Sequence, residues 1–240
     1  MSEFKICIPS KGRAGLITSI GIFKSAILYV PESEVSQYRI YKNKIIGVPD
    51  EIKGITKTRN WILKNNDCNV FFLDDDLQYG GYVERNSETY KVKRVTDEQT
   101  YLNELVKLFE ITYQTNSKIF GLFTVGNNLT NYSYSPFLFI GACLGSCMGI
   151  INDGSYYFNE EYEVKEDYEL TLRHIKERGL SVRSNILFMQ HEHTQTQGGC
   201  RDSKRIEKEK FAIKKLIKEY PNMIKEAKHR GTSFSIQLNI

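Results

Sequence analysis

Three consecutive aspartates, Asp74, Asp75 and Asp76, follow directly after a short apolar run at residues 70–73. Carboxylates at adjacent positions repel one another unless a cation neutralises them. In open α/β sheets ligands collect beyond the carboxyl ends of the strands, and a divalent ion needs only one or two carboxylates when substrate phosphates complete its coordination. The aspartates therefore predict a metal and phosphate site at a strand end. The alternative interpretation is a solvated acidic turn.

A second polar segment, Ser10–Arg13, stands in the equivalent position after the apolar run at residues 4–9. It offers two cations and backbone amides to an anion. It matches neither the G-x-G-x-x-G fingerprint nor a P-loop, so the ordinary dinucleotide and NTPase interpretations lose their main support. Arg59 and Asn60, early in a predicted helix, add another cation, although each of these residues alone is typical of a protein surface.

Glu166 and Asp167 open a predicted helix. The simple interpretation is stabilisation of the helix dipole, worth about 0.3–1 kcal/mol. The functional interpretation makes one of them a general base or a group that holds a sugar hydroxyl. A helix N-terminus lowers the pKa of a carboxylate, whereas a base works best near ambient pH, so the functional interpretation requires burial.

Two histidines, His191 and His193, stand two positions apart after the apolar run at residues 185–190. In an extended segment they share a face. A neutral imidazole there would complete a metal site. Packed or solvated histidines are the alternative.

The elements that position these residues follow from hydrophobic periodicity. Apolar runs of strand length stand at residues 4–9, 26–30, 44–48, 70–73, 119–125 and 185–190. Helical or looped connections separate these runs, which predicts an α/β protein with a largely parallel sheet. The run of small residues at 140–150 would let another group approach the backbone closely.

Four helices are predicted. The first covers residues 56–66, with Trp61 and Ile62 on the core. Thr96 and Gln99 have the spacing of a capping box before the second helix, which extends to Tyr113. The third begins at the Glu-Asp pair and ends at Arg178–Gly179, and the closing helix runs from about Lys204 to Pro221.

Composition describes a soluble globular chain of 240 residues, with 40% hydrophobic and 26% charged side chains. Disorder as the main state is excluded. The formal charge of +4 is unevenly distributed, because residues 201–230 hold eleven Lys or Arg against five acids. This segment suits a polyanionic partner. A solvated amphipathic helix explains the same pattern.

The five cysteines are scattered and form no C-x-x-C pair, so neither a disulfide framework nor a zinc site is indicated. We expect a reducing compartment. The N-terminal sequence lacks the pattern of a signal peptide, and the longest apolar stretch, residues 137–151, is too short to span a bilayer. The expected location is the cytoplasm, that of the host if a phage encodes the chain, with no membrane partner.

Several motifs of this chain, taken in order, resemble the glycosyltransferases associated with TET/JBP dioxygenases in phages. The matching segments are Ile8–Arg13, Lys57–Asn60, Phe72–Asp76, Glu166–Arg173 and Gly198–Arg201. The resemblance implies a GT-A-like, Rossmann-type α/β fold, with a mixed, mostly parallel sheet flanked by helices. We expect this domain over residues 1–200 and a basic C-terminal helical extension over residues 201–240, packed on the same domain.

The resemblance also implies site roles. The expected donor-binding residues are Pro9, Ser10, Lys11, Arg13, Arg59, Asn60, Asp74, Asp75, Gly198 and Gly199. Asp76 and Asp74 are expected to hold Mn²⁺ or Mg²⁺, with His193 or His191 as a further ligand, and Asp167 with Glu166 to face the sugar or acceptor. The residues expected to bind DNA are Lys204, Arg205, Lys208, Lys214, Lys215 and Lys218.

The implied reaction moves a sugar from a nucleotide-sugar donor, UDP-linked in our expectation, to a hydroxymethylated pyrimidine such as 5-hydroxymethylcytosine in phage DNA. Three alternatives stay open. The acceptor is a protein or glycan, the enzyme is a metal-dependent nucleotidyltransferase, or the chain is a non-catalytic DNA-binding module on the same fold.

Overall fold

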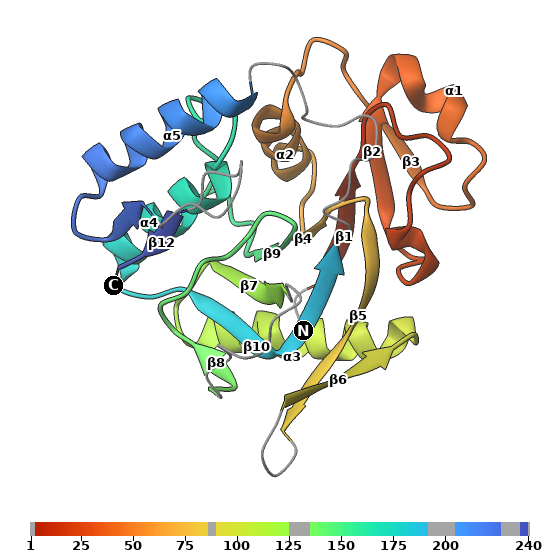
Figure 1. The fold of residues 1–240 in the computed structure, drawn as a ribbon. Coiled ribbons are helices and arrows are strands. Elements are labelled where there is room, and N and C mark those ends of the chain that lie inside the picture. The colour runs from red at the N-terminus through yellow and green to blue at the C-terminus, as the bar shows by residue number, and fades with distance from the viewer. Residues whose placement is uncertain (1–2, 86–89, 125–134, 192–204, 227–235, 240) are drawn as a thin grey trace.

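A computed structural model describes residues 3–85, 90–124, 135–191, 205–226 and 236–239 of the chain (Figure 1). Within these residues one ten-stranded sheet runs in the order β3-β2-β1-β4-β9-β7-β10-β5-β6, and β8 pairs with β10. Helices cover both faces of the sheet. The expected mixed, mostly parallel sheet flanked by helices is confirmed.

The first four strands are parallel neighbours. They are β1 (Phe4–Pro9), β2 (Ile27–Pro31), β3 (Ile45–Val48) and β4 (Asn69–Leu73). All four strands were predicted within three residues. In the sheet order 3-2-1-4, the chain passes from β1 to β2 and β3 on one side and then returns to β4 on the other side of β1. The position between β1 and β4 is therefore the topological switch point, where open α/β sheets bind ligands.

The second half of the sheet mixes directions. Its strands are β5 (Leu77–Arg85), β6 (Tyr90–Val95), β7 (Ile119–Thr124), β8 (Phe137–Leu138), β9 (Cys147–Ile150) and β10 (Val182–His191). β9 runs antiparallel to both β4 and β7, and β10 runs parallel to β7. β5 and β6 form an antiparallel hairpin that the sequence did not predict.

The helices and short turns lie between these strands. They are η1 (Ser19–Gly21), η2 (Glu32–Glu34), α1 (Val35–Tyr38), α2 (Ile55–Lys64), α3 (Glu98–Gln114), α4 (Glu166–Arg178) and α5 (Arg205–Glu219). A small antiparallel pair, β11 (Ile224–Glu226) and β12 (Ile236–Leu238), lies beside α5. Among the described helices none has the length and apolarity to cross a membrane.

The core has two main layers, one on each face of the sheet. On one face, Ile62 of α2 and Leu170 of α4 pack with Phe72 of β4. On the other face, Leu105 and Phe109 of α3 pack with strand residues of β1, β2 and β4. Because both faces are covered, these strands are continuous apolar runs in the sequence. Each such buried side chain contributes about 1.5–3 kcal/mol.

The expected capping box at Thr96 and Gln99 is wrong. The N-cap of α3 is Asp97, whose carboxylate accepts a hydrogen bond from the Thr100 amide at 2.9 Å. Aspartate is as good an N-cap as threonine, so the helix begins one residue later than the Ser/Thr pattern suggests. The predicted helix itself is present.

Candidate functional site

Two loops meet at the switch point between β1 and β4. Ser10–Arg13 follows β1, and Asp74, Asp75 and Asp76 follow β4. The backbone fixes the aspartates from two sides, because the Asp74 amide donates to the Ser146 carbonyl at 3.0 Å and the Asp75 carbonyl accepts from the Thr18 amide at 3.0 Å. The sequence prediction that both loops share one sheet edge is confirmed by this topology.

The middle aspartate points into the protein. Asp75 is 6% exposed, and its carboxylate accepts a hydrogen bond from the Ser10 hydroxyl at 2.6 Å and pairs closely with the Arg13 guanidinium. The Tyr38 hydroxyl lies 3.1 Å from the Ser10 Oγ and accepts from the Arg13 amide at 3.0 Å. Burial raises the pKa of Asp75, whereas Ser10 and Arg13 oppose the rise. These contacts hold the loop after β1 against β4.

The outer aspartates are the accessible ones. The side chains of Asp74 and Asp76 are 39% and 23% exposed, and each lies near one arginine, at 3.3 Å from Arg59 and 3.4 Å from Arg13 respectively. Two partly exposed carboxylates fit a Mg²⁺ or Mn²⁺ ion whose coordination is completed by substrate phosphates. Within the described residues, no group of three His, Cys, Asp or Glu side chains converges as a ready-made cage.

Arg59 lies behind the aspartates. Its side chain is 4% exposed and its guanidinium donates to Glu166 at 2.6 Å, to the Gly145 carbonyl at 2.8 Å and to Asp74 at 3.3 Å. The rings of Phe72 and Phe158 lie 5.7 and 5.6 Å from it. The guanidinium therefore binds groups of the protein itself, and it links Asp74 to Glu166 in the first turn of α4.

Gly145 explains part of the small-residue run at 140–150. A Cβ at this position would overlap the Arg59 guanidinium. The Gly145 carbonyl accepts from Arg59, and its amide donates to the Asp167 carboxylate at 3.0 Å. The group that approaches the backbone closely here is a side chain of the protein itself.

The two acids at the start of α4 lie in different environments. Glu166 is buried against Arg59, and burial together with the Asp167 charge raises its pKa to about 7, against the opposing effect of Arg59. Asp167 is half-buried, and its carboxylate accepts from the Gly145 amide and, at 2.8 Å, from the Tyr168 amide. The burial that a functional interpretation of this pair required is present at Glu166.

The remaining donor-binding predictions fall in several places. Lys11 is exposed beside the site, and Pro9 is buried at the end of β1. Asn60 lies away from the aspartates, because its amide donates to the Phe158 carbonyl at 2.9 Å and to the Glu160 carboxylate at 3.0 Å. Asn60 thus holds the segment before α4.

The histidine and glycine predictions lie mostly outside the described residues, which include neither His193 nor Gly198 and Gly199. The backbone of His191 ends β10, where it pairs with Leu77, the residue after Asp76. This register brings the end of β10 next to the aspartate turn. The side chain of His191 is not among the described parts of the chain.

Helix α5 carries the predicted DNA-binding cations, apart from Lys204, which lies outside the described residues. Three of them pair with carboxylates of the chain: Arg205 with Glu209 at 3.0 Å, Lys208 with Glu163 at 2.8 Å, and Lys215 with Glu161. Lys214 and Lys218 are exposed. The prediction that α5 binds DNA therefore depends mainly on these two lysines.

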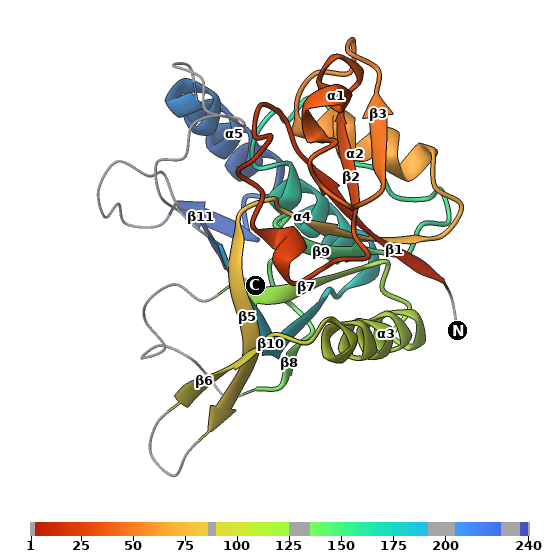
Figure 2. The same ribbon diagram turned by 90° about the vertical axis from the view of Figure 1, so that its right-hand side faces the viewer.

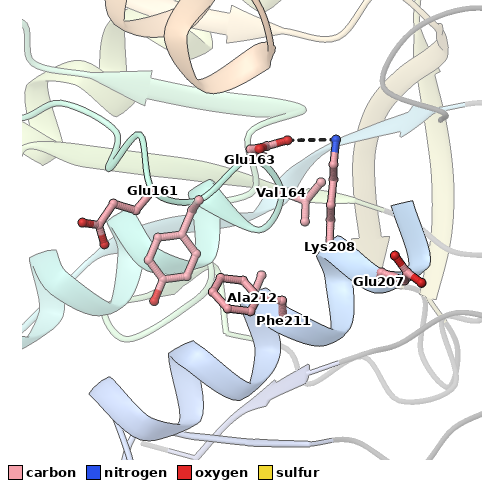
Figure 3. Close-up of a pocket in the computed structure, with 8 residues that line it drawn as sticks. Glu161, Glu163, Val164, Glu207, Lys208, Phe211 and Ala212 are labelled. Atoms are coloured by element: carbon pink, nitrogen blue, oxygen red, sulfur yellow. Dashed lines mark ion pairs between the residues drawn. The ribbon is translucent and has the colours of Figure 1, made fainter. Parts of the chain in front are cut away.

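A pocket of about 280 Å³ lies between α5 and residues 161–164, the segment that leads into α4 (Figure 3). Phe211 and Ala212 line it from the helix, and the Glu163–Lys208 ion pair spans it. This pocket includes none of the three aspartates. Beside it, α5 packs on α4 and on the segment before α4 through a buried apolar cluster and through ion pairs.

Three residues of the site had no signal of their own in the sequence. Tyr38 anchors the loop after β1, the Ser19 hydroxyl donates to the Asp74 carbonyl at 2.5 Å, and Gly145 links Arg59 to Asp167. Only the small-residue run pointed toward one of them. The others act through contacts between distant segments, which single-sequence patterns do not reveal.

The fold and the site together define an α/β protein that gathers carboxylates and cations at the switch point of its sheet. A family profile described as TET-Associated Glycosyltransferase matches residues 4–200. The chain belongs to this family, which confirms both the resemblance and the expected enzyme class of glycosyltransferase.

Solved structures with a similar arrangement include S. aureus TarS. The TarS 1–349 structure in complex with UDP is 13% identical, with a TM-score of 0.47, over 78% of this chain and 60% of that one. A longer TarS structure is 12% identical, with a TM-score of 0.49, over 90% of this chain and 40% of that one. The chain thus spans less than two thirds of the length of either TarS chain.

A third similar structure is CMP:2-keto-3-deoxy-manno-octonic acid synthetase complexed with CTP. It is 12% identical, with a TM-score of 0.42, over 89% of this chain and 99% of that one. No match was found among curated protein sequences.

Proposed function

We propose that this glycosyltransferase moves a sugar from a nucleotide-sugar donor to the hydroxymethyl group of a modified pyrimidine, such as 5-hydroxymethylcytosine, in phage DNA. The observation that carries the proposal is the family membership, combined with the meeting of Ser10–Arg13, the three aspartates and the Glu166–Asp167 pair at one sheet edge.

The donor diphosphate is proposed to lie over Asp74 and Asp76. These residues would hold Mn²⁺ or Mg²⁺, with His191 or His193 as a third ligand. When bound, the ion acts as a Lewis acid on the diphosphate leaving group. Lys11, which is exposed beside the aspartates, adds a cation for the same diphosphate. Arg59 acts indirectly, because it holds the side chains of Asp74 and Glu166 in place.

Asp167 is proposed as the group that receives the acceptor proton. The acceptor's hydroxymethyl oxygen forms a bond to the anomeric carbon, the bond between that carbon and the phosphate oxygen breaks, and the nucleoside diphosphate leaves with the electron pair. Asp167 is half-buried, and two backbone amides fix its carboxylate. In duplex DNA the target base must first leave the stack.

An acceptor screen tests this proposal. The protein is incubated with Mn²⁺ and a panel of nucleotide sugars headed by UDP-linked ones, and release of the nucleoside diphosphate is measured. The acceptors are hydroxymethylated DNA, unmodified DNA, glycans and protein. We expect release to depend on hydroxymethylated DNA. Release of pyrophosphate from a nucleotide would instead indicate a nucleotidyltransferase. Equal release of the nucleoside diphosphate with glycan or protein would indicate a glycan or protein acceptor.

DNA binding without any turnover is the fourth outcome. It would indicate a non-catalytic module on the same fold and would contradict the proposed reaction. A nucleotide-sugar binding measurement on the same preparation separates this outcome from a failure to find the right donor, because a non-catalytic module has no need to bind the donor.

A further inference from the structure

The β5–β6 hairpin is a long ribbon at the end of the sheet. β5 starts at Leu77, directly after Asp76, and β6 is the last strand in the sheet order. Figures 1 and 2 show the hairpin projecting away from the layer formed by α2 and α4. One end of the ribbon therefore lies at the proposed donor site, and the other extends away from the domain.

The last strand carries cations and no acids. Lys91, Lys93 and Arg94 of β6 are all exposed. Lys93 pairs with Glu84 of β5 at 3.6 Å, where the two side chains are 67% and 55% exposed. Because both partners are solvated, this ion pair contributes little and is readily exchanged for another anion.

Aromatic side chains accompany these cations. The Arg94 guanidinium lies 3.9 Å from the centre of the Tyr79 ring, on the face of the hairpin opposite Lys91 and Lys93. Tyr79 also contacts Phe188 of β10, in a small cluster whose partly buried members include Tyr90. One face of the hairpin thus combines Arg94 with partly buried aromatic rings, a combination typical of surfaces that bind nucleic acid, and the other face carries Lys91 and Lys93.

The corresponding cations of α5 are arranged differently. Arg205, Lys208 and Lys215 are each paired with a carboxylate of the chain. A phosphate that approaches them has to displace these carboxylates, whereas at β6 only the exposed Glu84 competes, among the ion pairs of the described residues. These three cations are therefore less available to a polyanion than Lys91, Lys93 and Arg94, and on α5 only the predicted cations Lys214 and Lys218 are comparably exposed.

We propose that the β5–β6 hairpin binds the phosphate backbone of the DNA acceptor and leads the strand toward the three aspartates. This inference rests on the proposed function, because it assumes a DNA acceptor. A two-stranded β-ribbon fits the major groove of B-DNA, and lysines and arginines bind the phosphates. The attachment of β5 to Asp76 joins this surface to the donor site.

DNA binding by fluorescence anisotropy at several salt concentrations tests the proposal. The variant Lys91→Ala/Lys93→Ala/Arg94→Ala is compared with Lys24→Ala/Lys42→Ala/Lys44→Ala, which removes three exposed cations near β3, at the opposite edge of the sheet. We expect only the hairpin variant to bind more weakly. Its slope of log affinity against log salt should be smaller by about 1 for each substituted cation that binds a phosphate in the wild-type protein.

Unchanged affinity and slope in the hairpin variant would overturn the proposal, as would weaker binding caused only by substitution of Lys214 and Lys218 on α5. If the hairpin variant self-associates while its DNA affinity is unchanged, the cations serve to keep the edge strand β6 from pairing with another chain, and this result would also overturn the proposal. Equal losses in both triple variants would show a non-specific charge effect, with the same consequence.

Turnover with a free hydroxymethylated deoxynucleoside separates this proposal from the proposed function. We expect the hairpin variant to keep that activity, because the small acceptor needs no phosphate-tracking surface. If the wild-type protein binds no DNA, the DNA acceptor fails together with the hairpin surface. If it binds DNA and the variant binds equally well, only the hairpin proposal fails.

Discussion

Two arginines pair with different members of the aspartate triplet, Arg13 with Asp75 and Asp76 and Arg59 with Asp74. Arg13, from the loop after β1, pairs with the buried Asp75, and together with Ser10 it holds the loop against β4. Arg59, from α2, pairs with Asp74 and with the buried Glu166 of α4. The first network fixes a loop, whereas the second joins Asp74 to the first turn of α4.

The difference assigns separate roles to adjacent aspartates. Asp75 is enclosed by its partners, whereas Asp74 and Asp76 keep part of their carboxylates exposed. We therefore expect Asp74 and Asp76 to act as a D-x-D pair for the ligand, with Asp75 as a structural residue between them. Four predictions test this division, and they are taken from the largest expected effect to the smallest.

Asp76→Ala should abolish metal-dependent donor binding, because it removes one of two accessible carboxylates. Asp75→Asn should keep that binding and instead lower the free energy of unfolding by about 1–3 kcal/mol, since the half-buried Arg13 loses the carboxylate that it pairs with most closely. Calorimetric titration with Mn²⁺ and UDP, and urea denaturation, measure the two effects. Equal loss of donor binding in both variants would contradict the division of roles.

Arg59→Ala should lower the free energy of unfolding by about 3–5 kcal/mol, because it leaves the Glu166 carboxylate buried without its cation. Glu166→Gln in the same chain should restore part of this loss, since it removes the uncompensated charge. Urea denaturation of the two single variants and the double variant measures the coupling. Strictly additive effects would show that the pair is not coupled.

Gly145→Ala should reduce activity by about 10–100-fold, the usual range when a residue that positions a ligand or its partner is displaced. The new Cβ would overlap Arg59 and disturb both Asp74 and Asp167. Gly21→Ala is the matched control, because a Cβ there meets no atom within 4 Å. The reduction should appear in kcat more than in KM. Equal activity of the two variants would remove Gly145 from the positioning network.

The pH dependence of stability should carry a contribution from Glu166. Burial raises its folded pKa from 4.5 to about 7, so the folded state binds the extra proton between these values. This contribution is present below about pH 4.5 and is lost as the pH rises through about 7. Urea denaturation from pH 4.5 to 8 should show a smaller loss in Glu166→Gln. The exposed Glu51→Gln substitution is the control and should retain the wild-type profile.

Much of the sheet could be predicted from the sequence because its strands are buried on both faces. β1 and β4 were visible as apolar runs, and each ends in a polar segment that marks the site. The β5–β6 hairpin was not predicted, because its strands are not continuous apolar runs: apolar and charged residues alternate along β6, and Gly80–Gly81 interrupt β5. Its stability comes from pairing with β10, which lies far away in the sequence.

The sequence indicated several residues of the candidate site, but not how these residues are arranged. Residue types and strand ends indicated the aspartates, Arg59 and Glu166, but they did not indicate that Arg59 is buried beside the rings of Phe72 and Phe158. That placement depends on Gly145, 86 residues away, whose missing side chain makes room for the guanidinium. Long-range packing of this kind leaves no periodic signal in the sequence.

The most direct test is the mass of the nucleosides obtained after hydroxymethylated DNA is incubated with the protein, nucleotide sugars and Mn²⁺ and then digested. We expect the modified nucleoside to gain the mass of one sugar residue, the gain to require the metal, and Asp76→Ala to abolish it. No mass gain with any donor, together with no binding of a nucleotide sugar, would contradict the proposed reaction.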